Sequence, residues 1–231
     1  NLLRAVSHDI RTPLTSILGA TSALLENGDR IGPEARTELL THVQEECRWL
    51  INMVENLLSI TRMSNESTLL SRQPEVVEEV VGGAVQKFPR RYPAVRIAVR
   101  PPEQFAVVLM DATLMEQVLI NLMENAVIHG KNTTSITISF AQRSGQVDIL
   151  VADDGGGVDP RIIDRILEDS FSQIRQERTD AKRSMGIGLS VCRPIVAAHG
   201  GTMAVRNTEQ GAEFTVTLPL QQEEYDVQGQ D

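Results

Sequence analysis

A heptad repeat constrains the fold of this chain more than any other feature of its sequence. Apolar and small residues recur at alternating spacings of three and four, in the set Leu40, Val43, Cys47, Leu50, Val54, Leu57 and Thr61. This spacing is the signature of a coiled coil or a helical bundle. It predicts a helix that begins near Pro33, a residue favoured in the first helical turn, and ends at about Met63.

A second helical segment precedes the repeat. It runs from about Leu2 to Glu26 and ends at the turn-forming residues Asn27-Gly28-Asp29. Two helices joined by so short a loop form an antiparallel hairpin. Because a single hairpin cannot bury the apolar stripes of both helices, the sequence predicts a homodimer in which two hairpins make a four-helix bundle.

The rest of the chain predicts an α+β fold. After a polar linker at Ser64–Ser67, strands are expected at Val95–Arg100, Phe105–Leu109, Ser135–Phe140, Gln146–Ala152, Gly201–Asn207 and Glu213–Leu218. Helices are expected at about Val76–Lys87, Thr113–His129, Pro160–Leu167 and Ile187–His199. Since strands and helices do not alternate strictly, a sandwich with helices on one face of a sheet fits best. We expect one domain at 1–66, a second at 67–220, and a polar, disordered tail at 221–231.

Composition narrows the possible functions. The chain has 22 basic and 31 acidic residues and a net charge of −9, which argues against broad nucleic-acid binding. Cys47 and Cys192 fit no metal-ligand spacing and are expected to be small buried residues in a reducing compartment. No apolar run approaches the roughly 20 residues that span a bilayer, and no signal peptide heads the chain. Without an initiator Met, the chain is expected to be a fragment whose membrane segments, if any, lie upstream.

The first cluster of chemistry-bearing residues is Ser7–Thr15. A histidine on a helix surface, here His8, is a competent nucleophile when a neighbour orients its ring. Asp9 can accept from one ring nitrogen and leave the other to attack phosphorus, while Thr12 lies one turn along on the same face. Pro13 lacks the N–H that would pair with the carbonyl of Asp9, so the helix should bend there. A solvated histidine beside an incidental carboxylate is the alternative interpretation.

The second cluster lies in the segment predicted as a helix at Thr113–His129. Asn121 and Asn125 are four residues apart and share a helix face. Amide oxygens suit Mg²⁺, which keeps several waters and bridges nucleotide phosphates. His129 and Lys131 follow at the helix end, where a cation could reach phosphates. Taken alone, two helical asparagines are more often solvated or capping residues.

Two glycine-rich segments complete the pattern. Asp153–Gly157 follows an apolar strand, so its first carboxylate could accept from an adenine amino group while the glycines let the base approach. Gly186–Leu189 opens a helix, where backbone amides form a phosphate cradle. The polar stretch Ser172–Ser184 between them is expected to be a lid over a ligand, or else a disordered loop. Each segment taken alone is weak evidence.

The order and spacing of these clusters resemble the sensor histidine kinase family along nearly the whole chain, from Leu2 to Leu220. Ser7–Thr15 is similar to the H box of that family, with aspartate in place of the usual glutamate. Asn121–Ala126 is similar to the N box, Asp153–Gly157 to the first glycine box and Gly186–Leu189 to the second.

Further segments extend the resemblance. Leu167 and Phe171 are similar to a degraded F box, and Gly211–Pro219 is similar to the final hairpin of the family. The run Gly188–Gly201 most resembles potassium- and osmolarity-responsive sensor kinases. The resemblance implies a dimeric four-helix bundle followed by an α/β sandwich ATP-binding domain of the Bergerat type.

The resemblance also implies roles for individual residues. His8 would accept the γ-phosphoryl group of ATP, with Asp9 as the orienting base, and an aspartate in a response-regulator receiver domain would then collect the group. Thr12 would be a candidate for dephosphorylating that regulator. The chain would be the cytoplasmic portion of a bacterial inner-membrane sensor. Transfer would rest on positioning and electrostatic stabilisation.

ATP and Mg²⁺ are the cofactors that the resemblance implies. Asn125 would be a Mg²⁺ ligand, with Asn121 beside it as a ligand or as a residue that positions water. Asp153 would recognise adenine. The pocket and the hinges of the lid would be shaped by Gly155, Gly157, Gly186, Gly188 and Leu189.

Departures from the family pattern leave two rival interpretations open. Asp154 stands where an Asn is frequent and Gly156 where a Pro is frequent, which predicts a more flexible and more acidic turn. One rival is an ATPase of the gyrase, Hsp90 and MutL superfamily, whose members use a glutamate where this chain has Asn121. The other is a pseudokinase that dimerises, binds ATP weakly and signals by docking. Only a kinase would form phosphohistidine.

Overall fold

The computed structural model describes residues 2–28, 30–64, 70–88, 92–130, 132–163, 166–167 and 185–221. For residues 2–9, 49, 52, 55–64, 185–188 and 190 it describes the backbone alone. Lys131, the F-box residue Phe171, the proposed lid Ser172–Ser184 and the tail from residue 222 onward therefore lie outside the described residues.

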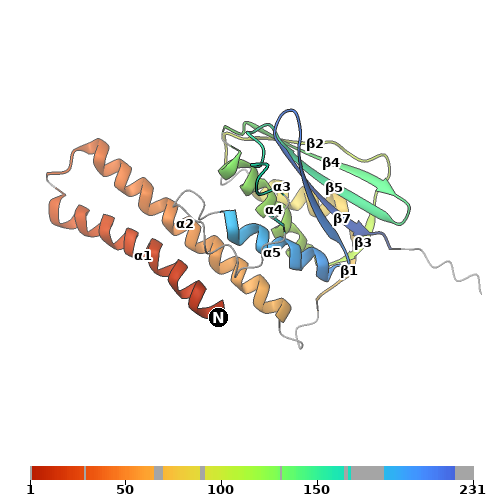
Figure 1. Ribbon diagram of the computed structural model, residues 1–231, viewed down its shortest axis with the longest axis horizontal. Coiled ribbons are helices and arrows are strands. Elements are labelled where there is room, and N and C mark those ends of the chain that lie inside the picture. The colour runs from red at the N-terminus through yellow and green to blue at the C-terminus, as the bar shows by residue number, and fades with distance from the viewer. Residues whose placement is uncertain are drawn as a thin grey trace, which may run out of the picture.

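The predicted helical hairpin is confirmed (Figure 1). Helix α1 spans Leu2–Asn27 and helix α2 spans Pro33–Ser64. The loop between them closes tightly because the amides of Arg30 and Ile31 both donate to the carbonyl of Asn27, at 2.8 and 3.1 Å. Helix α1 continues through Pro13. The bend expected at this proline stays a prediction.

The hairpin leaves apolar side chains uncovered on both helices. Among the described residues, the exposed large hydrophobic side chains of the hairpin are Leu14, Leu18, Leu25, Leu40, Ile51 and Val54. Cys47 was expected to be buried, and this is wrong: it is exposed, because it lies on the heptad seam that a single chain does not cover. Cys192 is buried as expected, and both cysteines are free.

The second part of the chain is the expected α/β sandwich. Its larger sheet has the order β2-β4-β5-β7-β6. The strands are β2 Arg96–Val99, β4 Ser135–Arg143, β5 Gln146–Asp153, β6 Thr202–Asn207 and β7 Ala212–Pro219. Strands β2 and β4 are parallel, and the other neighbours are antiparallel.

Three helices cover one face of this sheet: α3 Val77–Lys87, α4 Ala112–His129 and α5 Met185–Ala198 (Figure 1). Strand β5 shows why, since Val147, Ile149 and Val151 are buried while the residues between them are partly exposed. Helix α4 contacts α3, α5 and β5, and is therefore buried around much of its circumference. Helix α5 also packs against α2 of the hairpin.

Two local predictions need correction. Strand β1, Gln73–Val76, was not predicted; it pairs antiparallel with β3, Val107–Met110. A four-residue strand that contains a proline lacks the alternation that identifies longer strands. The helix expected at Pro160–Leu167 is also wrong, because the described part of this segment forms isolated turns. So short a helix is marginal without strong packing.

No helix in the described part of the chain is long and apolar enough to cross a membrane.

Candidate functional site

Helix α4 places the two asparagines of the predicted Mg²⁺ site in different surroundings. The helix begins at Asp111, whose Oδ1 accepts from the amide of Leu114 at 3.1 Å and so caps the first turn. Asn121 is 3% exposed, and its Oδ1 accepts from Nε2 of Gln117 at 3.1 Å. It also contacts the buried thiol of Cys192 on α5. Burial raises the pKa of this thiol to about 12. Asn121 therefore already serves contacts inside the protein.

Asn125 differs from Asn121 in one respect that points to a ligand. It is only 8% exposed, yet its Nδ2 is buried and has no hydrogen-bond partner among the described residues. An unpartnered buried amide costs on the order of 1–3 kcal/mol. Because such groups are rare in folded proteins, a bound polar group is the natural explanation.

Asp153 lies at the end of β5 and is 7% exposed. Its Oδ1 accepts from the amides of Gly155, at 2.9 Å, and Ala212, at 3.2 Å. Burial raises the pKa of this carboxyl above its ordinary value, although the two amides oppose the shift. Among the described residues, no hydrogen bond is recorded to Oδ2. That oxygen is available to accept from a ligand, as the assignment to adenine requires.

The glycine turn is joined to the end of α4. The amide of Gly156 donates to the carbonyl of Gly130 at 2.5 Å. A Cβ on Gly155 would lie 2.2 Å from that same carbonyl oxygen and 2.6 Å from Oγ1 of Thr133. Only glycine allows the backbone at position 155 to lie this close to Gly130. The end of β5 that carries Asp153 is therefore held beside the end of α4.

Substituting Gly155 with alanine is expected to destabilise the protein by about 1–3 kcal/mol and to weaken ATP binding, because the new methyl group meets a backbone carbonyl that cannot move aside. Thermal unfolding with and without nucleotide measures both effects. Gly82→Ala is the matched control: its Cβ would meet nothing within 4 Å, and it lies inside α3. It should stabilise the protein by about 0.5–1 kcal/mol. Equal behaviour of the two variants would contradict the argument.

Asp154 is fixed by four hydrogen bonds, and the flexibility expected of this turn stays a prediction. Its Oδ1 accepts from the amides of Thr134 and Ser135, and its Oδ2 accepts from their hydroxyl groups, at distances from 2.6 to 2.9 Å. Desolvation acts to raise the pKa of Asp154, but these hydrogen bonds outweigh it and hold the pKa well below the ordinary value. The carboxylate thus ties the glycine turn to the start of β4.

This lowered pKa predicts an acid-dependent contribution to stability. Because the folded-state pKa of Asp154 is below the unfolded value of about 3.9, ionisation stabilises the fold above about pH 4. The contribution is lost as the pH falls through the folded-state pKa. The wild type should therefore melt above Asp154→Asn at pH 7, and the difference should shrink below about pH 4. A melting difference that does not change with pH would rule this out.

His129 and Lys131 were both expected to lie near the phosphates as cations, and the structure describes only His129. His129 ends α4 and is partly buried, and burial lowers its pKa below the ordinary 6.5. Burial therefore favours the neutral imidazole, which would offer a hydrogen bond instead of a charge. Lys131 is outside the described residues and stays a prediction.

The second glycine cluster opens a helix, as expected. Helix α5 begins at Met185, so Gly186 and Gly188 fall in its first turn, where amide groups lack partners within the helix. Leu189 is 3% exposed and belongs to the core, which anchors this helix end to the sandwich.

Helix α1 carries the predicted phosphoacceptor. His8, Asp9 and Thr12 all lie within it. The side chains of His8 and Asp9 are outside the described part of the chain, whereas Thr12 is partly buried. The sequence-based roles of these residues stay predictions.

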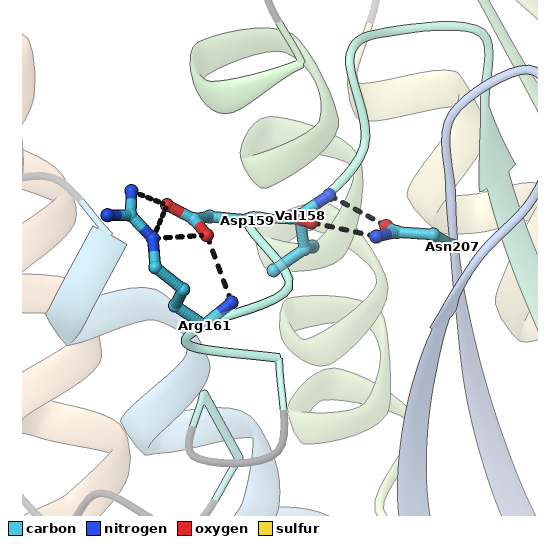
Figure 2. A network of polar contacts seen from close by, with 4 residues as sticks. All are labelled: Val158, Asp159, Arg161 and Asn207. Atoms are coloured by element: carbon cyan, nitrogen blue, oxygen red, sulfur yellow. Dashed lines mark hydrogen bonds and ion pairs between the residues drawn. The ribbon is translucent and has the colours of Figure 1, made fainter.

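Two residues outside the motifs make contacts that join distant segments of the sandwich. His199 is 3% exposed. Its Nε2 accepts from the amide of Asp111 at 3.0 Å, and its Nδ1 donates to the carbonyl of Ile195 at 2.7 Å, so it joins the start of α4 to the end of α5. Asn207 pairs with the backbone of Val158 (Figure 2). No local sequence pattern marks either contact.

Comparison with known families divides the chain into two matches. Residues 1–66 match the His Kinase A (phospho-acceptor) domain. Residues 110–222 match the family described as histidine kinase-, DNA gyrase B- and HSP90-like ATPase.

Individual proteins agree with these matches. The chain is 38% identical over 220 residues to the sensor protein KdpD of Clostridium acetobutylicum, covering 95% of this chain and 24% of that protein. The chain thus spans about a quarter of the length of that relative. Its fold is similar to that of the histidine kinase ThkA in complex with the response regulator TrrA, with a TM-score of 0.67, 22% identity, and coverage of 94% of this chain and 60% of the other.

Full-length ShkA in complex with AMPPNP is also similar, with a TM-score of 0.61 and 27% identity. The match covers 94% of this chain and 45% of ShkA. With the H, N and glycine boxes in the expected order, and with both family matches and these relatives in agreement, the chain belongs to the sensor histidine kinases: it joins a phospho-acceptor domain to the ATPase domain shared with gyrase B and Hsp90.

Proposed function

We propose that this chain is the kinase core that transfers the γ-phosphoryl group of ATP to His8. The observation that carries the proposal is a pair of polar groups on adjoining elements: Oδ2 of Asp153, a residue only 7% exposed, and the buried, unpartnered Nδ2 of Asn125. One suits an adenine amino group and the other suits the phosphate end of the nucleotide. The gyrase-type ATPase is disfavoured because Asn121, at the place of the water-activating glutamate, is buried in internal contacts.

The adenine end would be recognised by Asp153. Its Oδ1 is held by the amides of Gly155 and Ala212, so its Oδ2 is oriented before the nucleotide arrives. Gly155 and Gly157 let the turn pack closely against Gly130 and Asn207, which fixes the chain that carries Asp153. Gly157 has a φ of +70°, a backbone conformation that residues with a side chain rarely adopt.

Mg²⁺ fits the donor set through Asn125. Oδ1 of Asn125 would be a protein ligand of the ion, with phosphate oxygens and water as further ligands. The unpartnered Nδ2 of the same side chain would donate to a phosphate oxygen. When bound, the ion neutralises charge on the phosphates. Asn121 would ligate the ion beside Asn125 or position one of its waters. Lys131 and the backbone amides near Gly186 and Gly188 would contact phosphate oxygens.

At the acceptor, a lone pair on one ring nitrogen of His8 would form the N–P bond as the bond to the bridging oxygen breaks. The electron pair of that bond leaves with ADP. Asp9 would accept a hydrogen bond from the other ring N–H and so stabilise the positive charge that develops on the ring. An aspartate of a response regulator would then take the phosphoryl group. Thr12 would serve a separate reaction, in which its hydroxyl positions the water that hydrolyses the regulator's acyl phosphate to free aspartate and inorganic phosphate.

A homodimer would complete the phospho-acceptor domain. The exposed apolar side chains of α1 and α2, including Leu18 and Leu25, need a partner, and a second copy of the hairpin would bury them in a four-helix bundle. The similarity to KdpD supports a role as the cytoplasmic core of a longer, membrane-associated sensor.

The test is incubation with γ-labelled ATP and Mg²⁺, followed by acid and alkali treatment. A kinase forms a phosphohistidine label that is lost in acid and retained in alkali, and a response regulator added afterwards should remove it. ATP bound without label would support the pseudokinase instead. Steady release of phosphate with no labelled intermediate would support the gyrase-type ATPase.

A further inference from the structure

The backbone that follows the glycine turn is held by one side chain from a distant strand. Asn207 is the last residue of β6. Its Oδ1 accepts from the amide of Val158 at 2.8 Å, and its Nδ2 donates to the carbonyl of Val158 at 2.7 Å (Figure 2). A carboxamide that satisfies both backbone groups of one residue imitates the pairing of a neighbouring strand. No other side chain type of this length has a donor and an acceptor in that arrangement.

The approach between these groups depends on the residue before Val158. A Cβ on Gly157 would lie 2.9 Å from Oδ1 of Asn207. The glycine of the family motif therefore makes room for the Asn207 contact, besides adopting a positive φ. This gives Gly157 a function that its place in the motif does not reveal.

The same hairpin also holds the adenine-binding carboxylate. Asn207 pairs with Ala212 in the β6–β7 register, and the amide of Ala212 donates to Oδ1 of Asp153. The end of this hairpin therefore contacts the chain on both sides of the glycine turn, at Asp153 and at Val158. A shift of the hairpin would move both contacts together.

The next charged residue does not compete for Asn207. Asp159 turns to the opposite side of the chain, where it accepts from the backbone amide of Arg161 at 2.9 Å and from its guanidinium group (Figure 2). The carboxamide of Asn207 is thus left to the backbone of Val158.

We propose that Asn207 is a positioning residue for nucleotide binding: it ties the exit of the glycine turn to the β6–β7 hairpin and so keeps Oδ2 of Asp153 directed at adenine. The inference rests on the proposed function and adds a residue 49 positions away from the segment that it holds. Because Asn207 acts on the adenine end, its loss should weaken binding and leave phosphoryl transfer at saturating ATP intact.

The experiment compares Asn207→Ala and Asn207→Asp with the control Arg206→Ala. Arg206 is the preceding residue of the same strand, and its exposed side chain pairs with Glu213, not with Val158. The dissociation constant for Mg-AMPPNP is measured by calorimetry, well below the melting temperature of each variant. KM for ATP and kcat for His8 labelling are measured in parallel.

Asn207→Ala is expected to raise the dissociation constant and KM about tenfold, as for the loss of a hydrogen-bonded pair of about 1.4 kcal/mol, with kcat within about twofold of wild type. Asn207→Asp keeps the acceptor but sets a carboxylate against the carbonyl of Val158. Its affinity at pH 8 should therefore fall as it does in Asn207→Ala, relative to wild type at the same pH.

Two results would overturn the inference. One is wild-type affinity in Asn207→Ala, equal to that of Arg206→Ala. The other is a fall in kcat without a change in KM. The wild-type measurement separates the two failures: no binding of Mg-AMPPNP by the wild type overturns the proposed function, whereas wild-type binding with unchanged affinity in Asn207→Ala overturns this inference alone.

Discussion

Replacing His8 with glutamine is expected to abolish phosphoryl incorporation from ATP while leaving ATP binding at the wild-type level. Glutamine is polar and of similar size, so helix α1 should persist, but its amide nitrogen cannot act as a nucleophile. Removing the nucleophile of a serine protease costs about 10⁶-fold in rate, so label should fall to background. Gel-based detection of the acid-labile label, with calorimetry of Mg-AMPPNP binding, measures both parts.

His42→Gln is the matched control for this substitution. His42 is an exposed histidine on α2 of the same hairpin, where its Nε2 lies 2.7 Å from Oγ of Ser16. The His42→Gln variant should still be labelled at His8, because His42 belongs to no predicted motif. Persistent acid-labile label in His8→Gln would move the acceptor to another residue. Loss of label in both variants would indicate damage to the hairpin instead.

Replacing Asp153 with asparagine is expected to weaken ATP binding by roughly 10- to 150-fold, from the loss of a charge-assisted hydrogen bond of about 1.5–3 kcal/mol. The physical reason lies in the amides of Gly155 and Ala212, which both donate to Oδ1. An asparagine must turn its only oxygen towards them. Its NH₂ group then faces the adenine amino group, so a donor meets a donor.

The same geometry predicts a change in base preference. The NH₂ group that repels an adenine amino group can donate to the carbonyl oxygen of guanine, so the ratio of ATP to GTP affinity should fall in Asp153→Asn. Asp148→Asn is the control, since Asp148 is on the same strand but pairs with Thr217 on the outer side of the sheet. An unchanged affinity ratio in Asp153→Asn would exclude this carboxylate as the adenine acceptor.

Most elements could be predicted from the sequence, because their signals are local. The heptad repeat, Pro33 and the break after Asn27 define the hairpin, and the boundaries of α1 and α2 differ from the predicted ones by about a residue. The capping residue Asp111 and the alternation in β5 are equally local signals. Strand β1 and the false helix at Pro160–Leu167 failed because short segments carry too few residues for a periodicity to show.

The chemistry-bearing segments of the site could also be predicted. The sequence did not show which of their polar atoms bond within the protein and which remain for a ligand. Asn121 and Asn125 look equivalent in a helical pattern, yet one is used by Gln117 and the other keeps an unpartnered amide. Asp154 was expected only to make the turn more acidic and flexible, and the sequence did not indicate that four groups of Thr134 and Ser135 bind its carboxylate. These differences depend on which neighbours the fold brings within reach.

The sequence by itself determined the family, the fold class and the identity of the motif residues. Periodicity, capping and motif spacing can all be read from the order of residues in the chain. Only the tertiary structure decided which polar atoms are already satisfied and which remain for a ligand. It also decided that Asn207 holds Val158 and that His199 holds Asp111. Such hydrogen bonds join residues 49 and 88 positions apart, and no local pattern specifies them, because their partners meet only when the sheet and its covering helices have packed.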